Sequence, residues 1–193
     1  MSRLCVFCGS TPGRRPEYAA ATRAFGRLLA ERGYGLVYGG GHVGLMGVVA
    51  DAVLEAGGEA IGVMPHALIA REIGHTGLTT MHVVDSMHER KALMADLADA
   101  FVALPGGVGT FEEMFEAITW TQLGVHVKPC GLLNVGGFYD HLLRFLDQAW
   151  TEGFIKPETR AIVKASADPA DLLDQLAAAE MPAVPRWITR DTR

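Results

Sequence analysis

The chain has 193 residues and a formal net charge of −5, from 17 basic and 22 acidic side chains. This balance excludes a sequence-independent nucleic-acid binder, which would need a broad basic surface. Nucleic acid is therefore not expected as a partner. No stretch approaches the roughly 20 apolar residues that span a membrane, so a membrane is not expected as a partner either.

Apolar runs alternate with helical patterns along almost the whole chain. We expect strands at 4–8, 35–38, 60–64, 81–84, 100–104, 131–133 and 161–163, and helices at 16–32, 44–56, 87–98, 111–122, 138–151 and 169–179. This alternation predicts crossover connections between parallel strands, and the continuous apolar runs are typical of strands covered on both faces. The sequence therefore predicts one Rossmann-like, doubly wound α/β domain over residues 1–180, followed by a C-terminal tail at 181–193.

The three cysteines, Cys5, Cys8 and Cys130, cannot all pair and lie in or beside predicted buried strands. Reduced thiols and a cytoplasmic location are the simplest interpretation. The Cys5-x-x-Cys8 pair lies within a strand pattern, which favours packing over a redox role. The histidines show no metal-ligand spacing, so no metal is expected.

The helical stripe of the 138–151 segment is strongly apolar. We expect it to pack into the core, with part of it free to serve a subunit interface. It consists of Phe138, Leu142, Phe145, Leu146 and Trp150.

The unusual segments of the chain each follow a predicted strand. Ligands of doubly wound sheets bind outside the carboxyl ends of the strands, so these segments should meet at one edge. They are residues 9–11, 39–42, 65–72, 86–91 and 105–113.

Residues 105–113 read Pro-Gly-Gly-Val-Gly-Thr-Phe-Glu-Glu, between a strand and an apolar helix. Glycines let a ligand approach the backbone, and a helix N-terminus offers free N–H groups to a phosphate. The alternative is a tight turn in which Thr110 caps the helix and Glu113 completes a capping box. Three glycines in four residues exceed what a cap requires, so we favour a phosphate-binding loop.

Residues 39–44, Gly-Gly-Gly-His-Val-Gly, match the dinucleotide fingerprint. A nicotinamide site also needs an acidic residue at the end of the next strand, and Glu59 lies at the wrong end of that strand. An oxidoreductase is therefore disfavoured. The turn either contacts a ligand or lets a helix pack closely.

Ser86 and Glu89 form a capping-box pattern that predicts a helix start. Arg90 and Lys91 then fall on its fourth and fifth positions, where the helix dipole disfavours cations. Two adjacent cations there suggest an anionic partner, against the alternative of a solvated surface.

Together, residues 105–113 and Met-His-Glu-Arg-Lys at 87–91 resemble the Lonely Guy family of cytokinin riboside 5′-monophosphate phosphoribohydrolases. The resemblance continues through residues 8–10, 38–41, 44–47, 119–124 and 132–135. It implies a Rossmann-like fold, a homodimer and no cofactor. It also implies release of a free base and ribose 5-phosphate from AMP or a cytokinin-type nucleotide.

By this resemblance Arg90 and Glu113 would be catalytic. The residues that would contact the substrate are Glu72, Lys91, Gly106, Gly107, Val108, Gly109, Thr110, Phe111, Glu112 and Thr119. Relatives often carry the label lysine decarboxylase. A pyridoxal-phosphate enzyme needs a Schiff-base lysine, and Lys91 alone among the four lysines lies beside the predicted site.

Cleavage of an N-glycosidic bond builds positive charge on the ribose, which a carboxylate can stabilise while it orients or deprotonates the attacking water. Glu112 and Glu113 are both placed for this role, and only one can face the substrate because adjacent helical residues point about 100° apart. A nucleotide-binding or carrier module without turnover remains the alternative function.

Overall fold

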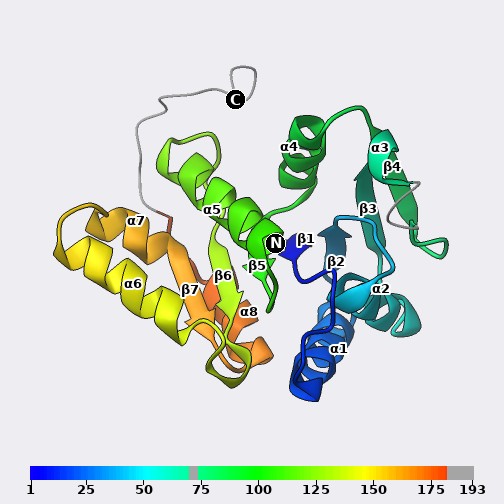
Figure 1. The fold of residues 1–193 in the computed structure, drawn as a ribbon, viewed down its shortest axis with the longest axis horizontal. Helices are drawn as coiled ribbons and strands as arrows, with labels where there is room; N and C mark the ends of the chain where they lie inside the picture. Colours follow the sequence, from blue (N-terminus) through cyan, green and yellow to red (C-terminus); the bar gives the residue numbers. More distant parts are fainter. Residues whose placement is uncertain (70–73, 182–193) are drawn as a thin grey trace.

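The structure is a computed structural model that describes residues 1–69 and 74–181. Its described strands form one parallel sheet in the order β4-β3-β2-β1-β5-β6-β7 (Figure 1). The strands are β1 (Arg3–Phe7), β2 (Gly35–Tyr38), β3 (Ala60–Pro65), β4 (Thr80–Val84), β5 (Ala100–Ala103), β6 (Cys130–Leu133) and β7 (Val163–Ser166). The predicted doubly wound, Rossmann-like sheet is confirmed.

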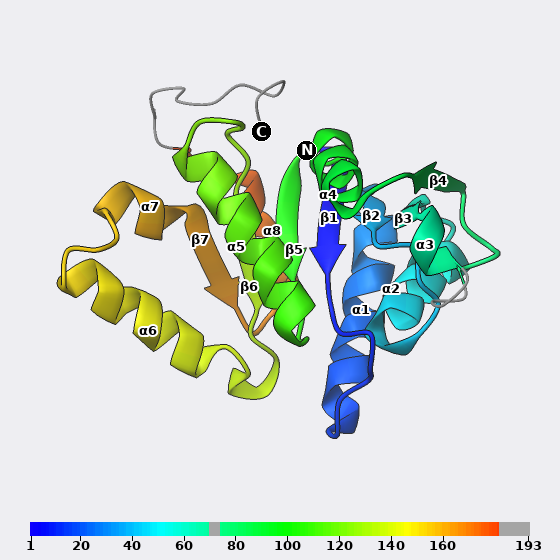
Figure 2. The same ribbon diagram turned by 45° about the horizontal axis from the view of Figure 1, so that its top comes forward.

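Helices cover both faces of this sheet (Figure 2). One core cluster joins the sheet to α1 (Pro16–Glu31), α2 (Gly44–Glu55) and α8 (Pro169–Ala177). The other cluster joins it to α4 (Met87–Leu97), α5 (Val108–Gln122), α6 (Asp140–Thr151) and α7 (Pro157–Ile162). Short α3 (His66–Ile69) and the 3₁₀ helix η1 (Val135–Gly137) lie in connections. Within the described residues no helix has the length and apolar character that a membrane crossing needs.

Two predicted boundaries are wrong. Helix α5 begins at Val108 instead of residue 111, because Gly107 supplies the extended N-cap backbone (φ −104°, ψ −157°). The strand expected at 161–163 lies instead at Val163–Ser166. Pro157 occupies the first position of α7, where its fixed φ favours a helix, and the helix continues to Ile162.

The apolar stripe of α6 is only partly in the core, consistent with the expectation that part of it stays free. Leu146 is buried, whereas Phe145 is 64% exposed and Trp150 is 46% exposed. Helix α6 therefore carries apolar side chains that the described part of one chain does not cover.

Strand β1 lies in the middle of the sheet. The chain first adds β2, β3 and β4 on one side of β1 and then β5, β6 and β7 on the other, so the switch point lies between β1 and β5. At their carboxyl ends the Gly9 N–H donates to the Pro105 carbonyl at 3.1 Å, and the Gly9 carbonyl accepts from Leu45 N–H at 2.9 Å. The loops after β1 and β5 and the start of α2 are thus held together. Crevices of this kind are where ligands bind in doubly wound folds.

Candidate active site

The glycine-rich loop leads into the first turn of α5. A Cβ on Gly106 would overlap Thr110 Oγ1 and lie 2.9 Å from the Gly9 nitrogen, so packing explains this glycine. At Gly107 and Gly109 a Cβ would meet nothing within 4 Å, and neither residue has a positive φ. Internal packing of the described chain does not account for these two glycines, whereas a ligand on the helix start would.

Thr110 is not the N-cap, so the capping-box alternative is wrong. It is the third residue of α5 and is buried, and the N-cap Gly107 makes no side-chain cap hydrogen bond. The first N–H groups of a helix have no partner within the helix and attract anions. The start of α5 is therefore suited to a phosphate.

A cavity of about 170 Å³ lies beside this loop. It joins the loops that follow β1 and β5, which meet where the strand order reverses. Its lining residues are Thr11, Pro12, Gly13, Tyr18, Leu45, Pro105, Gly106, Gly107 and Phe138.

Helix α4 begins as predicted at Met87. Ser86 Oγ accepts the Glu89 N–H at 3.1 Å, and Glu89 Oε2 accepts the Asp85 N–H at 2.9 Å. The carboxylate thus bonds one residue before the N-cap, which satisfies the same turn. This start sets Arg90 and Lys91 on the side of α4 that meets the sheet and α5.

Arg90 is buried at the carboxyl ends of β2 and β3. Its Nε donates to the Val63 carbonyl at 3.1 Å, and its Nη2 donates to the Gly39 carbonyl at 3.2 Å. A Cβ on Gly39 would overlap Nη2, so the glycine turn after β2 makes room for this guanidinium. The third nitrogen, Nη1, lies 3.7 Å from Glu113 Oε1.

Glu113 forms an ion pair with Arg90 that is too long for a hydrogen bond. Its side chain is only 14% exposed. Burial raises the pKa of Glu113 from 4.5 to about 7, and the Arg90 charge offsets this only in part. A carboxyl group that titrates near neutral pH is suited to proton transfer.

Lys91 is paired within the protein. Its Nζ lies 2.6 Å from Glu112 Oε1 and 3.0 Å from Glu116 Oε1, and its side chain is 11% exposed. Burial acts to lower the pKa of Lys91, but the hydrogen bonds to the two carboxylates outweigh it and raise the pKa. Lys91 is therefore paired with two carboxylates of α5.

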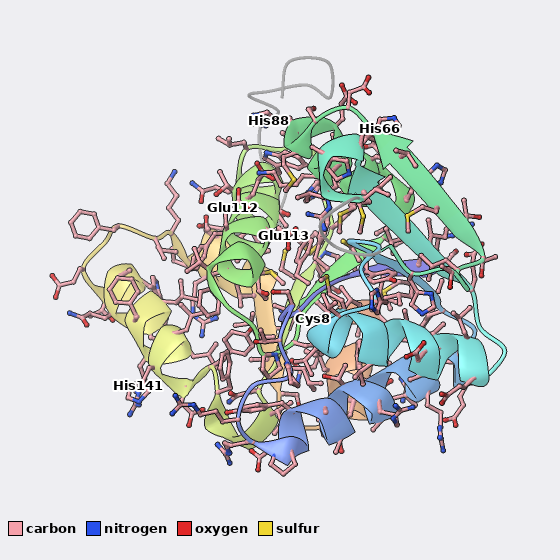
Figure 3. All side chains as sticks on the ribbon, turned by 45° about the vertical axis from the view of Figure 1, so that its right-hand side comes forward. Cys8, His66, His88, Glu112, Glu113 and His141 are labelled. Atoms are coloured by element: carbon pink, nitrogen blue, oxygen red, sulfur yellow. The ribbon has the colours of Figure 1, made fainter. Side chains whose placement is uncertain are left out.

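The structure brings most of the predicted site residues to one edge of the sheet. Glu112 and Glu113 lie near the start of α5, with His88 on α4 and His66 on α3 on the neighbouring side (Figure 3). Arg90 and Lys91 face these glutamates from α4. Gly106 and the N-cap Gly107 lead directly into α5, and the first turn of the helix consists of Val108, Gly109, Thr110 and Phe111.

One of the predicted substrate contacts is not part of this cluster. Thr119 is exposed and donates its hydroxyl to the Phe115 carbonyl at 2.8 Å. Nine residues separate it from Thr110, roughly 14 Å along a helix. Glu72 lies outside the described residues.

Sequence reasoning singled out the glycine turn at residues 39–44 but not the contact of Gly39 with Arg90, and it missed the Val63 carbonyl and Glu116. The sequence could have predicted Glu116, because it lies four residues after Glu112 and therefore on the same face of the helix. The contact from Gly39 to Arg90 could not be predicted in this way, since 51 residues separate the two.

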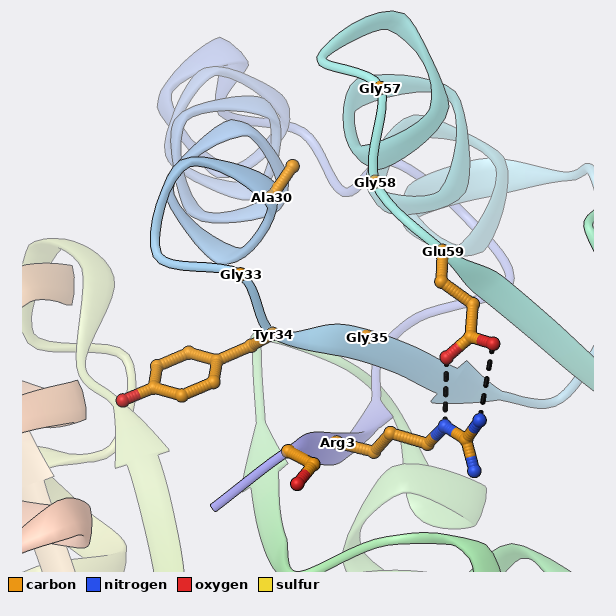
Figure 4. A pocket seen from close by; sticks show the side chains of 9 residues that line it. Arg3, Ala30, Gly33, Tyr34, Gly35, Gly57, Gly58 and Glu59 are labelled. Carbon is orange, nitrogen blue, oxygen red and sulfur yellow. Dashed lines mark hydrogen bonds and ion pairs between the residues drawn. The ribbon is translucent and has the colours of Figure 1, made fainter.

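The acidic residue that a nicotinamide site would need is engaged elsewhere. Glu59 precedes β3 and binds Arg3 through Nε–Oε2 and Nη2–Oε1 hydrogen bonds of 2.7 and 3.1 Å (Figure 4). This pair lines a groove of about 560 Å³ at the amino edge of the sheet. Glu59 is therefore at the opposite edge from the glycine turn, as the sequence predicted.

The fold and this edge define a Rossmann-like protein with a glycine-rich loop at a helix N-terminus, beside a buried arginine–glutamate pair. Among solved structures, the molybdenum cofactor carrier protein from Chlamydomonas reinhardtii has the same fold. Its TM-score is 0.69 at 22% identity, over 92% of this chain and 99% of that chain.

Sequence comparison shows the family. Residues 46–176 match the family described as possible lysine decarboxylase. The chain is 52% identical to the cytokinin riboside 5′-monophosphate phosphoribohydrolase LOG7 of Arabidopsis thaliana, over 90% of this chain and 80% of that protein. It is also 52% identical to the cytokinin riboside 5′-monophosphate phosphoribohydrolase of Rhodococcoides fascians, over 86% and 84%. The chain belongs to the Lonely Guy family, as its motifs predicted.

Proposed function

We propose that this chain hydrolyses the N-glycosidic bond of nucleoside 5′-monophosphates, AMP or a cytokinin-type nucleotide, to free base and ribose 5-phosphate. The names of its relatives support this activity. The observation that carries it is the buried Glu113, with a pKa of about 7, close to the uncapped helix start. A phosphate site and a proton-transferring carboxylate within two helical turns are what this reaction requires.

In the proposed reaction the 5′-phosphate binds the N–H groups at residues 106–110. The bond from C1′ to the base breaks, and the base leaves with the electron pair of that bond and takes up a proton from solvent. The Glu113 carboxylate stabilises the positive charge on the ribose, accepts a proton from the water whose oxygen bonds to C1′, and then releases this proton to solvent. Arg90, beside Glu113, stabilises negative charge on the departing base.

Between the two adjacent glutamates, the geometry favours Glu113 as the catalytic group. The Glu112 side chain is 52% exposed and paired with Lys91. Its carboxylate is thus open to solvent and already engaged by a cation, whereas that of Glu113 is buried. We propose that Glu112 of α5 and Lys91 of α4 contact the substrate as an ion pair.

The decarboxylase description of the family is not favoured for this chain. A Schiff-base lysine must lose its proton to act as a nucleophile. Lys91 is held by two carboxylates that raise its pKa, which keeps it protonated. We propose a reaction that needs neither cofactor nor metal, so base release should persist in EDTA. A strict requirement for added Mg²⁺ would contradict this.

A homodimer accounts for the position of Thr119. Phe115, 38% exposed, and Thr119 share the outer face of α5. A nucleotide on the glycine loop of one subunit would reach Thr119 only from a second copy. Light scattering should give twice the chain mass of 20.7 kDa. A monomer at micromolar concentration would contradict this proposal.

We also propose a cytoplasmic location. All three cysteines are free and buried. Burial raises the pKa of Cys5, which keeps its thiol protonated and unreactive. Unpaired thiols are typical of proteins in a reducing compartment.

The deciding experiment compares base release from AMP, a cytokinin-type nucleotide and adenosine. Binding energy from a remote phosphate can lower the barrier at the reacting bond, so kcat/KM for adenosine should be at least about 100-fold lower. Equal values for adenosine and AMP would contradict the phosphate site. AMP binding without base release would favour the non-catalytic carrier function instead.

A further inference from the structure

Three glutamates in the first nine residues of α5 form ion pairs with two cations of α4. Arg90 faces Glu113, and Lys91 lies between Glu112 and Glu116. We propose that Glu116 is a positioning residue which, by holding Lys91, sets the charge around Glu113 and so the pH range in which the enzyme works. This inference rests on the proposed function of Glu113.

The geometry places Glu116 and Glu113 around one small, partly open space. This cavity of about 10 Å³ has room for a single water molecule at most. Its walls are mainly apolar, which screens charges poorly and strengthens their mutual interaction. The residues that line it are Phe7, Lys91, Ala95, Phe101, Glu113, Glu116, Ala117 and Trp120.

The charges around Glu113 act in opposite directions. After burial, which raises the pKa of Glu113 most, Arg90 and Lys91 lower this pKa, and Glu112 and Glu116 raise it. Titratable groups from three places face Glu113. They are Arg90 and Lys91 of α4, Cys5 in β1 with Cys8 directly after it, and Glu112 and Glu116 of α5 itself.

The thiols of Cys5 and Cys8 do not compete for this role, because burial raises the pKa of both and keeps them neutral. Lys91 and Glu116 are therefore two halves of one ion pair with opposite effects on Glu113. Loss of Glu116 should lower the pKa of Glu113, and loss of Lys91 should raise it. A merely structural ion pair would not produce opposite shifts, since either variant breaks the same contact.

The test is the pH dependence of kcat/KM for base release from AMP in the wild type, Glu116→Gln and Lys91→Met. The wild type should gain activity through a midpoint near 7, where Glu113 ionises. The midpoint should fall by about half a pH unit or more in Glu116→Gln and rise by a similar amount in Lys91→Met. Glu116→Asp, which keeps the charge, should return toward the wild-type midpoint.

Glu59→Gln is the matched control, because it breaks the Arg3–Glu59 pair at the far edge of the sheet. Its profile should coincide with that of the wild type. Shifts in the same direction for both variants, or no shifts, would overturn the inference while wild-type turnover upholds the proposed function.

Carboxylate NMR titration gives a readout that does not depend on turnover. The Glu113 resonance, assigned by its loss in Glu113→Gln, should show the same opposite shifts. If the wild type released no base, the proposed function would fail, and the NMR midpoints would still decide whether Glu116 and Lys91 set the charge at Glu113.

Discussion

The two edges of the sheet each hold an arginine–glutamate pair, and the pairs differ in every other respect. At the amino edge Arg3 and Glu59 make two hydrogen bonds, and each side chain is 38% exposed. At the carboxyl edge Arg90 and Glu113 are 8% and 14% exposed and remain 3.7 Å apart. Arg90 directs its closer hydrogen bonds to backbone carbonyls, so Glu113 is buried with a cation that satisfies it only in part.

This difference shows that the residue types alone do not separate a structural pair from a functional one. A solvated, well-bonded pair adds little to stability and leaves its members with ordinary chemistry. A buried and incompletely satisfied pair costs stability and shifts a proton equilibrium toward neutral pH. The following predictions test this contrast.

The largest expected effect is on turnover. Glu113→Gln and Arg90→Ala should each lower kcat for base release about 100- to 10,000-fold, because each removes a group proposed to act on the reacting atoms. Circular dichroism should show an intact fold. Glu59→Gln should retain wild-type turnover. Near-normal activity in Glu113→Gln would transfer the catalytic role to Glu112.

A smaller loss is expected from Gly39→Ala. The new methyl group would overlap Arg90 Nη2 and push the guanidinium away from Glu113. Since small misplacements of catalytic groups are costly, kcat/KM should fall about 10- to 100-fold with little change in Tm. In an Arg90→Ala background the same substitution should have no further effect. Additive losses would show that Gly39 acts independently of Arg90.

The third effect is on stability as a function of pH. The native state holds the Glu113 proton up to about pH 7, whereas an unfolded chain releases it near 4.5. The native state therefore binds more protons between these values, and stability falls as pH rises through them. In Glu113→Gln the free energy of unfolding should decrease by about 1–3 kcal/mol less than in the wild type over this pH range. Urea unfolding at pH 4.5 and pH 7.5 measures it, and an unchanged slope would contradict a buried, titrating Glu113.

The smallest effect is expected at the amino edge. Glu59→Gln should lower the free energy of unfolding by less than about 1 kcal/mol, since exposed pairs contribute little. The difference should shrink in high salt, where exposed charges are screened. A loss of several kcal/mol would mean that this pair is more than a solvated surface contact.

The sequence predicted the sheet, the helices on both faces and the edge at which the unusual loops meet. These features depend on local patterns, namely the alternation of apolar runs with helical periods and the position of glycines after strands. The start of α5 was misplaced because Thr110 and Glu113 fit a capping pattern as well as a helix interior. The structure separates the two possibilities, because Gly107 is the N-cap and Thr110 is the third residue of the helix.

The partners of Arg90 and Lys91 could not be predicted for a related reason. The Arg90 guanidinium binds Val63 and Gly39, which lie 27 and 51 residues away, and its direction follows from how α4 sits on the sheet. The carboxylates that pair with Lys91 come from α5, 21 and 25 residues later in the chain. Helix position gives the location of a side chain, whereas tertiary packing selects its partner.

The central place of β1 also has a consequence for how the protein folds. Strands β1 to β4 come first in the chain and can pair with one another. The other edge of β1 pairs with β5, which begins 97 residues after β1 begins. Arg90 arrives with the first half and Glu113 with the second. We therefore expect a nascent or partly folded chain to display an unpaired strand edge together with a cation lacking its carboxylate. Docking of β5 and α5 would cover this edge and bring Glu113 to Arg90, so that a glutamate titrating near neutral pH would mark the joining of the two halves of the sheet.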